Sequence, residues 1–205
     1  MHSALPILAG RFVRLEPLEL HHAEALVASS AEDPSLYQWS PVPQSLAAAR
    51  AYIQTALDWR AAGTALAFAT VRLADESVIG STRFFEMTRW NWPAAHERCA
   101  RTAPDICEIG YTWLAASAVR TPANTEAKLL MLTHAFEVWE VFGVCLHTDV
   151  RNTRSRAAIE RIGGKLDGIL RAHRLAADLT PRNSCRYSIV AAEWPEIKRR
   201  LTDRL

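Results

Sequence analysis

Residues 149–164 read DVRNTRSRAAIERIGG and decide most of what can be predicted about the fold. This stretch indicates the end of a buried strand, an Asn at a helix start, a short basic helix and a glycine stop. Residues 108–114 (EIGYTWL) predict another strand, and residues 120–126 (RTPANTE) predict the helix start that follows it. Helix starts leave backbone N–H groups unpaired, and such groups attract anions. Two of them beside two strand ends predict a pocket for a phosphate-bearing ligand.

The composition is that of a single globular domain. The 205 residues include 49% apolar and 22% charged residues, and no repeat or linker divides them, so we expect one domain over residues 1–205. The net charge of +2 is too small to favour nucleic acid, which makes a nucleic-acid partner unexpected. The sequence shows no signal peptide and no membrane-spanning run, so we expect a cytoplasmic protein with no membrane partner.

Arginines crowd the stretch after the second strand, and two interpretations of them stay open. They are a solvated helix face, or they form a cationic mouth for a polyphosphate. The residues concerned are Arg151, Arg154, Arg156, Arg161, Arg171, Arg174, Arg182 and Arg186.

Four cysteines show no spacing typical of metal or redox chemistry. They contain no CxxC pair, so we expect no metal site and no disulfide framework. Three of them lie in or beside apolar runs and are expected to be buried free thiols. The cysteines are Cys99, Cys107, Cys145 and Cys185.

Periodicity predicts a mixed α/β fold. Strands are expected at residues 11–17, 66–73, 78–85, 107–114, 144–150, 168–175 and 186–191. Helices are expected at residues 21–30, 45–62, 153–162 and 193–201, with one more after residue 120, capped by Asn124 or by Thr121 with Pro122 as its first residue. The β-rich first half predicts antiparallel pairs. The strand–helix–strand order of the second half predicts a right-handed crossover between parallel strands.

At residues 108–114, at Asn152-Thr153-Arg154-Ser155 and at residues 171–174 (RAHR), the chain resembles the GCN5-related N-acetyltransferase (GNAT) superfamily. Within it, the similarity is to the RimJ/RimL-like branch that acetylates ribosomal-protein N-termini. The resemblance implies a central mixed, partly splayed sheet flanked by helices on both faces. It also implies acetyl transfer from acetyl-CoA to a primary amine, on a protein N-terminus or a small molecule, by direct attack.

The resemblance places acetyl-CoA between residues 107–114 and 144–150. Backbone groups of Trp113 and Leu114 would pair with the pantetheine amides, as a peptide adds to a sheet edge. Asn152 would cap its helix and also reach a pantetheine carbonyl. One departure from the family pattern concerns the pyrophosphate loop, where the usual glycines are missing and Pro122 has no N–H. The expected replacements are Arg120, the Thr121 hydroxyl and the N–H groups of Ala123, Asn124 and Thr125; the alternative is that these residues form only a helix cap.

Acetylation of an amine needs a base for the ammonium and a proton for the leaving thiolate. The family often has a glutamate where Glu108 stands, so Glu108 is the expected base, directly or through water. Its alternative role is an ion pair with an arginine. The family's tyrosine acid has no counterpart in residues 158–160 (AIE). Ser155 either donates to the thiolate or hydrogen-bonds into its own helix. Tyr111, His147 and His173 are reserve candidates.

The acceptor is expected to enter beside the first two helices and residues 86–106. The candidates in this segment for the entrance through which the acceptor reaches the site are Arg89, Trp90, Trp92 and His96. The rival functions are a catalytically silent CoA-binding or interaction module on the same fold, a nucleic-acid-binding protein, and an acyltransferase for longer acyl chains. A homodimer is possible, with Trp194 and the terminal helix as its contact.

Overall fold

The fold is built on one eight-stranded mixed sheet. The computed structural model describes residues 5–205. The strands are β1 (Leu8–Ala9), β2 (Val13–Pro17), β3 (Ala65–Arg72), β4 (Ser77–Thr88), β5 (Ile106–Leu114), β6 (Gly143–Asp149), β7 (Lys165–Leu175) and β8 (Pro181–Val190). They lie in the order β1-β2-β3-β4-β5-β6-β8-β7. β5 and β6 pair in parallel, and the other neighbouring strands pair antiparallel. The predicted mixed sheet, with parallel strands in its second half, is confirmed.

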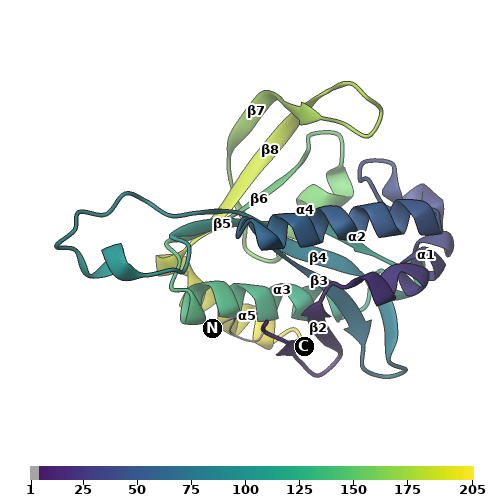
Figure 1. Ribbon diagram of the computed structural model, residues 1–205, viewed down its shortest axis with the longest axis horizontal. Coiled ribbons are helices and arrows are strands. Elements are labelled where there is room, and N and C mark those ends of the chain that lie inside the picture. The colour runs from purple at the N-terminus through teal and green to yellow at the C-terminus, as the bar shows by residue number, and fades with distance from the viewer. Residues whose placement is uncertain (1–4) are drawn as a thin grey trace.

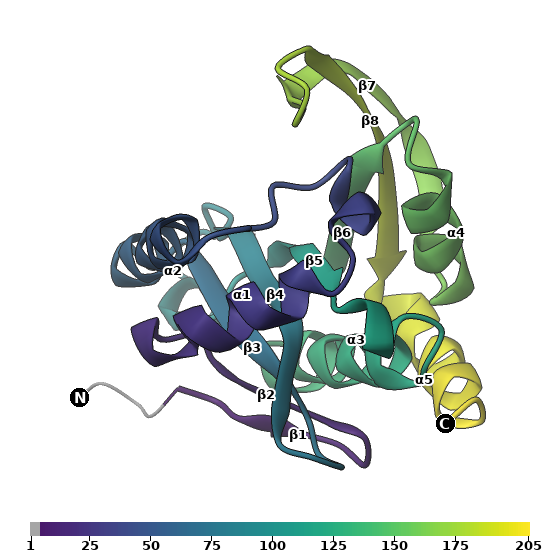
Figure 2. The same ribbon diagram turned by 90° about the vertical axis from the view of Figure 1, so that its right-hand side faces the viewer.

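Helices cover both faces of the sheet. They are α1 (Ala23–Ala31), α2 (Leu46–Ala61), α3 (Ala123–Thr133), α4 (Thr153–Arg161) and α5 (Trp194–Thr202). α1 and α2 enclose one apolar core that includes Leu26 and Ile53. α3, α4 and α5 enclose the other, which includes Met131, Ile159 and Leu201. Figures 1 and 2 show α1 beside α2 and α3 beside α5. None of the helices within residues 5–205 is long and apolar enough to cross a membrane.

The helix and strand that carry the site begin as their sequences predict. α4 follows Asn152, whose Oδ1 accepts the Ser155 N–H at 3.0 Å. In β6, Val144 and Leu146 point into a core, and His147 on the opposite face lines a cavity. Alternation along β6 therefore separates its core positions from His147, while the end of the strand, from Leu146 to Asp149, lines the cavity with consecutive residues.

The start of α3 differs from the prediction that Asn124 caps it. The residue at the N-cap is Pro122, and no side chain makes a capping bond there. Thr121 contributes more weakly, because its Oγ1 accepts the Ala123 N–H at 3.3 Å. Pro122 already has a helical φ of −61°, so the helix starts earlier than an Asn124 cap would allow. Asn124 is thereby left free to line the cavity.

β5 and β6 splay apart after a short parallel contact, as predicted. They pair only at three positions, from Ile106↔Gly143 to Glu108↔Cys145, within the described chain. Beyond Glu108, β5 stays paired with β4 through a bulge, and Tyr111 in that bulge has a φ of +51°. Such a backbone conformation is unusual for a bulky residue and is typical of functional sites. Figure 2 shows β5 and β6 separating above α3.

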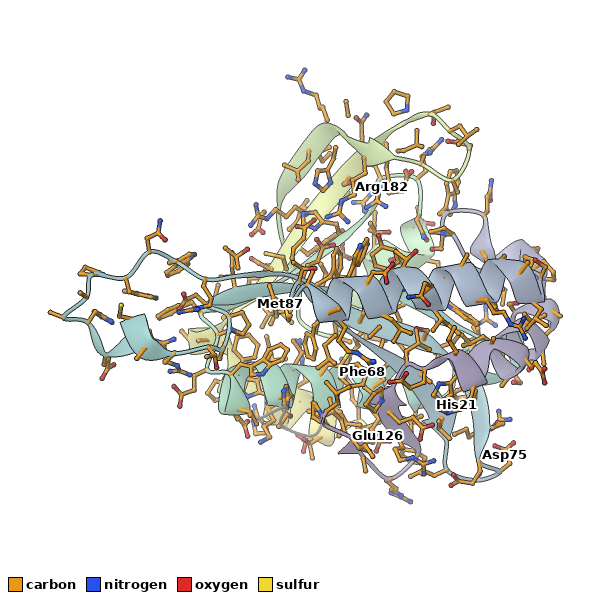
Figure 3. The ribbon with its side chains drawn as sticks, in the orientation of Figure 1. His21, Phe68, Asp75, Met87, Glu126 and Arg182 are labelled. Carbon is orange, nitrogen blue, oxygen red and sulfur yellow. The ribbon has the colours of Figure 1, made fainter. Side chains whose placement is uncertain are left out.

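Glu126 ties the N-terminal segment to α3. Its buried carboxylate accepts the backbone N–H groups of Arg11, Phe12 and Val13, each at 2.7 Å. Three hydrogen bonds to one charge fix α3, and so its N-terminus, against β2. Figure 3 labels Glu126 below Phe68, well away from Arg182 at the other side of the view.

The structure contradicts the expectation that Trp194 serves a dimer contact. Trp194 is 4% exposed, stacks on Phe136 and donates its indole N–H to Glu137 at 2.7 Å. Its apolar surface is used inside the chain, so it has none left for a partner. The homodimer itself stays a prediction.

All four cysteines are free thiols, as expected. Cys107 and Cys185 are buried, Cys145 is half-buried and Cys99 is exposed. Burial raises the pKa values of the Cys107 and Cys145 thiols. Two cysteines rather than the expected three are fully buried.

Candidate active site

A cavity of about 760 Å³ fills the gap between the splayed strands. Its walls are β5, the start of α3, β6, α4, the turn end of the β7–β8 hairpin, and the segment between α1 and α2 with Tyr52 of α2. The structure brings nearly every predicted site residue to it. Those lining it are Glu108, Trp113, Leu114, Arg120, Thr121, Asn124, Thr125, Asn152 and Ser155. Ala123 is the exception, because its side chain is buried in the α3 core.

Free backbone donors at the start of α3 line one end of this cavity. The first helical bond runs from Glu126 N–H to the Pro122 carbonyl at 2.9 Å. The N–H groups of Asn124 and Thr125 have no hydrogen-bond partner among residues 5–205. Arg120 precedes them with a φ of +63°, and its exposed side chain lines the same wall. This end therefore carries positive charge from a guanidinium and from the helix dipole.

α4 presents a second helix start across the gap. Asn152 uses Oδ1 for the cap and keeps its amide NH₂ unengaged within the described chain. The Ser155 hydroxyl makes no hydrogen bond to the described residues, so the alternative in which it bonds back into its own helix is wrong. One turn of α4 thus offers two uncommitted polar groups to the cavity.

The arginines divide between the two interpretations. Arg151 is held by Asp149 and Asp178, and Arg156 donates to the Tyr187 hydroxyl. Arg154 lines the cavity but already donates to the Leu36 carbonyl. Arg161 lines the cavity and is exposed, with no ion pair among residues 5–205. Arg120 and Arg161 are therefore the freest cations on the cavity wall.

The inner edge of β5 is open, with one correction. Trp113 and Leu114 pair with Ser81 and Gly80 of β4, and no β6 residue within the described chain pairs with them. The Leu114 carbonyl, expected to be free, accepts the Tyr37 hydroxyl at 3.0 Å. Tyr37 reaches it because residues 34–37 fold over the end of β5 as a 3₁₀ turn.

Glu108 is buried among charged groups at the closed end of the gap. Its side chain is 3% exposed, and Oε2 accepts from Arg174 at 3.0 Å. His147 Nδ1 also lies 2.9 Å from Oε2, but it makes no hydrogen bond to it. Oε1 has no partner among the described residues. Arg174 continues to Glu86 on the surface, so both expected roles of Glu108, cavity carboxylate and arginine partner, are compatible with one arrangement.

The two histidines that were further catalytic candidates, His147 and His173, lie next to each other near Glu108. The rings of His147 and His173 are 4.9 Å apart, and His147 lines the cavity. Burial, with Arg174 nearby, lowers the pKa of His173. Burial and Arg174 also lower the pKa of Arg182, which Figure 3 shows between the β7–β8 hairpin and α2. Tyr111 lines the cavity as well and packs on Phe85.

Lys128 is a cavity residue that the sequence analysis missed. It lies in the second turn of α3, 4% exposed, and its Nζ donates to Thr112 at 2.6 Å and to Thr82 at 3.0 Å. A lysine inside an amphipathic helix normally predicts a solvent-facing position, so the pattern gave no signal. The i, i+4 spacing from Asn124 is the one clue, since it puts both on one helix face.

The aromatic residues expected at the acceptor mouth lie elsewhere. None of Arg89, Trp90, Trp92 and His96 lines the cavity. Trp90 stacks on Phe142 and Trp92 stacks on His96, within a segment that extends away from the sheet in Figure 1. These aromatic rings pack on one another rather than on the cavity. The aromatic residues of this segment therefore did not predict where the acceptor enters.

One group of potential metal ligands is found within residues 5–205, and it lies outside the cavity. Donor atoms of Glu16, His21 and His22 come within 4.8 Å of one another. The Glu16 carboxylate is already bound by His22 and by Arg14. These pairs account for the arrangement without a cation.

Comparison with known families agrees with this geometry. Residues 13–165 match the family model of the acetyltransferase (GNAT) domain. The chain belongs to the GNAT family. It is thus an acetyl-CoA-dependent acyltransferase, and the cavity between its splayed strands forms a cleft.

Several solved structures are similar to this chain over nearly its whole length. A protein from T. thermophilus assigned to the acetyltransferases is 32% identical over all of both chains, with a TM-score of 0.79. A GCN5-related N-acetyltransferase from Brucella melitensis is 26% identical over 97% of this chain and 84% of its own, with a TM-score of 0.78. RimJ from Mycobacterium smegmatis, solved with CoA-disulfide, is 21% identical over 97% and 91%, with a TM-score of 0.77, which shows the shared fold alone. No curated protein sequence matches the chain.

Proposed function

We propose that this protein is an N-acetyltransferase that moves the acetyl group of acetyl-CoA to a primary amine by direct attack. The observation that carries the proposal is the buried Glu108 carboxylate, whose free Oε1 stands at the closed end of the cleft in the part of the chain that the structure describes. A thioester held along β5 would end near this carboxylate. The acceptor class, a protein N-terminus or a small-molecule amine, is proposed from the RimJ-like fold.

Acetyl-CoA fits the chemistry of the two cleft ends. The N–H groups of Asn124 and Thr125, with Arg120, suit the pyrophosphate. The Thr121 hydroxyl, expected to join them, donates its hydrogen to the Ala118 carbonyl at 2.7 Å and has none left for a phosphate. The Ala123 N–H, already bound to Thr121, adds only to the helix dipole. The open edge of β5 suits the pantetheine amides, with Trp113 contributing more than Leu114, whose carbonyl is engaged by Tyr37. Across the gap, the Asn152 amide suits a pantetheine carbonyl.

Glu108 takes the proton of the attacking ammonium, directly or through water. Oε2 stays bound to Arg174, which holds the carboxylate in place, and Oε1 accepts the proton. The amine nitrogen then bonds to the thioester carbonyl carbon and the C–S bond breaks. The Ser155 hydroxyl, uncommitted within the described chain, donates a hydrogen bond to the developing thiolate.

A panel of amines tests this proposal, with release of the CoA thiol as the readout. We expect Glu108→Gln to lower turnover by roughly 10²–10⁴-fold while acetyl-CoA still binds. Glu86→Gln is the matched control, because Glu86 is the other carboxylate on Arg174 but is exposed and does not line the cavity. Equal turnover of the wild type and Glu108→Gln would refute the role of Glu108 as the general base. Acetyl-CoA binding with no turnover on any amine would support the silent CoA-binding module instead.

A further inference from the structure

Lys128 stands out because it is a buried amine with no acidic partner in the described chain. Within residues 5–205 its Nζ contacts only the hydroxyls of Thr82 and Thr112. Those two hydroxyls are 2.8 Å apart and hydrogen-bond to each other, so neither needs the lysine. Burial of an unpaired amine opposes folding. Its presence is therefore better explained by chemistry in the cleft than by stability.

The position of Lys128 is fixed relative to β5. Thr112, its nearest partner, follows the bulge at Tyr111 on the strand whose inner edge is open. Cys107 and Ile109 of β5 point into the core that contains α3, so Glu108 between them points to the other face of the sheet. Lys128 and Glu108 therefore approach the cleft from opposite faces.

We propose that Lys128 is the proton donor to the sulfur of CoA in the acetyl transfer, which rests on the function proposed above. The amine nitrogen forms its bond to the carbonyl carbon as the C–S bond breaks. The electron pair of that bond stays on sulfur, and Lys128 Nζ–H transfers a proton to it, leaving a neutral amine and CoA thiol. The ammonium loses two protons on becoming an amide: Glu108 takes the first before attack, and the second leaves the nitrogen to water as the tetrahedral intermediate collapses. Glu108 then releases its proton to solvent and Lys128 takes one up, so both groups are restored and one proton is released overall. Ser155 orients the sulfur with its hydrogen bond.

The acidity of Lys128 suits this role. Burial lowers the pKa of its ammonium to about 7, close to working pH, where a general acid is most effective. No nearby charge within the described chain adds to this shift. The charged or titratable groups that line the same cavity are Tyr37 before α2, Tyr52 on α2, Glu108 and Tyr111 on β5, His147 and Asp149 on β6, Arg120 before α3, Arg154 and Arg161 on α4, Arg174 on β7 and Arg182 on β8.

The experiment compares CoA with desulfo-CoA, which differs only by lacking the thiol, in calorimetric titrations of the whole protein. Lys128→Met removes the amine and keeps the length of the side chain, and the Thr82–Thr112 hydrogen bond remains to hold the site. Lys165→Met, at a 74% exposed lysine on β7, is the matched control. We expect Lys128→Met to unfold at the same temperature as the wild type or higher, because a buried amine has been removed.

In the wild type and in Lys165→Met, CoA is expected to bind more tightly than desulfo-CoA. In Lys128→Met that preference is expected to fall by roughly tenfold or more, while the affinity for desulfo-CoA is unchanged. Thiolate absorbance should show that the pKa of the bound CoA thiol lies below that of free CoA, measured in parallel, in the wild type but not in Lys128→Met. An unchanged preference and an unchanged thiol titration would overturn the proposal. Failure of both ligands to bind the wild type would instead overturn the proposed function.

Discussion

Asn152 has two roles that can be separated by substitution. Its Oδ1 caps α4 through the Ser155 N–H at 3.0 Å, and its amide NH₂ is left for the ligand. Asn152→Ala removes both groups. Loss of the cap costs about 1 kcal/mol of the free energy of unfolding, which corresponds to a fall of roughly 2–4 °C in Tm for a domain of this size. Loss of one neutral hydrogen bond to pantetheine lowers the affinity for acetyl-CoA by roughly two- to tenfold.

Asn152→Ser separates the two effects, because Ser is also a good N-cap but has no amide to offer. Thermal unfolding and calorimetric titration of acetyl-CoA should be measured on all three proteins. We expect the Ser variant to recover most of the lost stability and little of the lost affinity. If it binds acetyl-CoA as the wild type does, the Asn152 amide does not contact the ligand and only the cap matters.

Two further predictions concern stability. Glu126→Ala removes three hydrogen bonds from a charged carboxylate to the N–H groups of residues 11–13, of which that of Val13 is buried, and should cost at least about 3 kcal/mol in denaturant unfolding. Glu97→Ala, at an exposed position, is the control, and a loss under about 1 kcal/mol would contradict this account of the α3 anchor. The pKa of Lys128 is lowered to about 7 in the folded chain and returns to its ordinary value of 10.5 on unfolding, so between these values the unfolded chain binds the extra proton. The wild type should therefore gain stability relative to Lys128→Met as pH rises from about 7 to about 10, by at most about 1.4 kcal/mol per unit, and a difference independent of pH would contradict the burial of the amine.

The elements of the cleft were predictable because their signals are local. Alternation in residues 144–149 predicts the strand β6 and its core positions Val144 and Leu146, and an Asn before a basic helix predicts the start of α4. The separation of β5 from β6 was predicted from the family resemblance and not from the periodicity of either strand. Pairing of only three positions is a tertiary property that no single strand encodes.

The features that the sequence could not supply are long-range contacts. Tyr37 takes the Leu114 carbonyl across 77 positions of the chain, and Trp194 packs on Phe136 across 58 positions. Lys128 shows the same limit, because a lysine in a helix is normally solvated and only the meeting of α3 with Thr82 and Thr112 buries it. Of the two predicted caps of α3, Asn124 was wrong for a local reason, since the φ of Pro122 starts the helix before Asn124 can cap it. The alternative, Thr121 followed by Pro122, is nearer to the structure, because Thr121 Oγ1 accepts the Ala123 N–H.

The central claim is that acetyl-CoA binds between β5 and β6, across the starts of α3 and α4. It is tested most directly by calorimetric titration of acetyl-CoA into the wild type and into Ala158→Trp, which places a large side chain on the α4 wall of the cavity. The account predicts micromolar binding to the wild type that weakens with added salt and is lost in the variant. Absence of binding to the wild type, or equal binding to a folded Ala158→Trp protein, would contradict it.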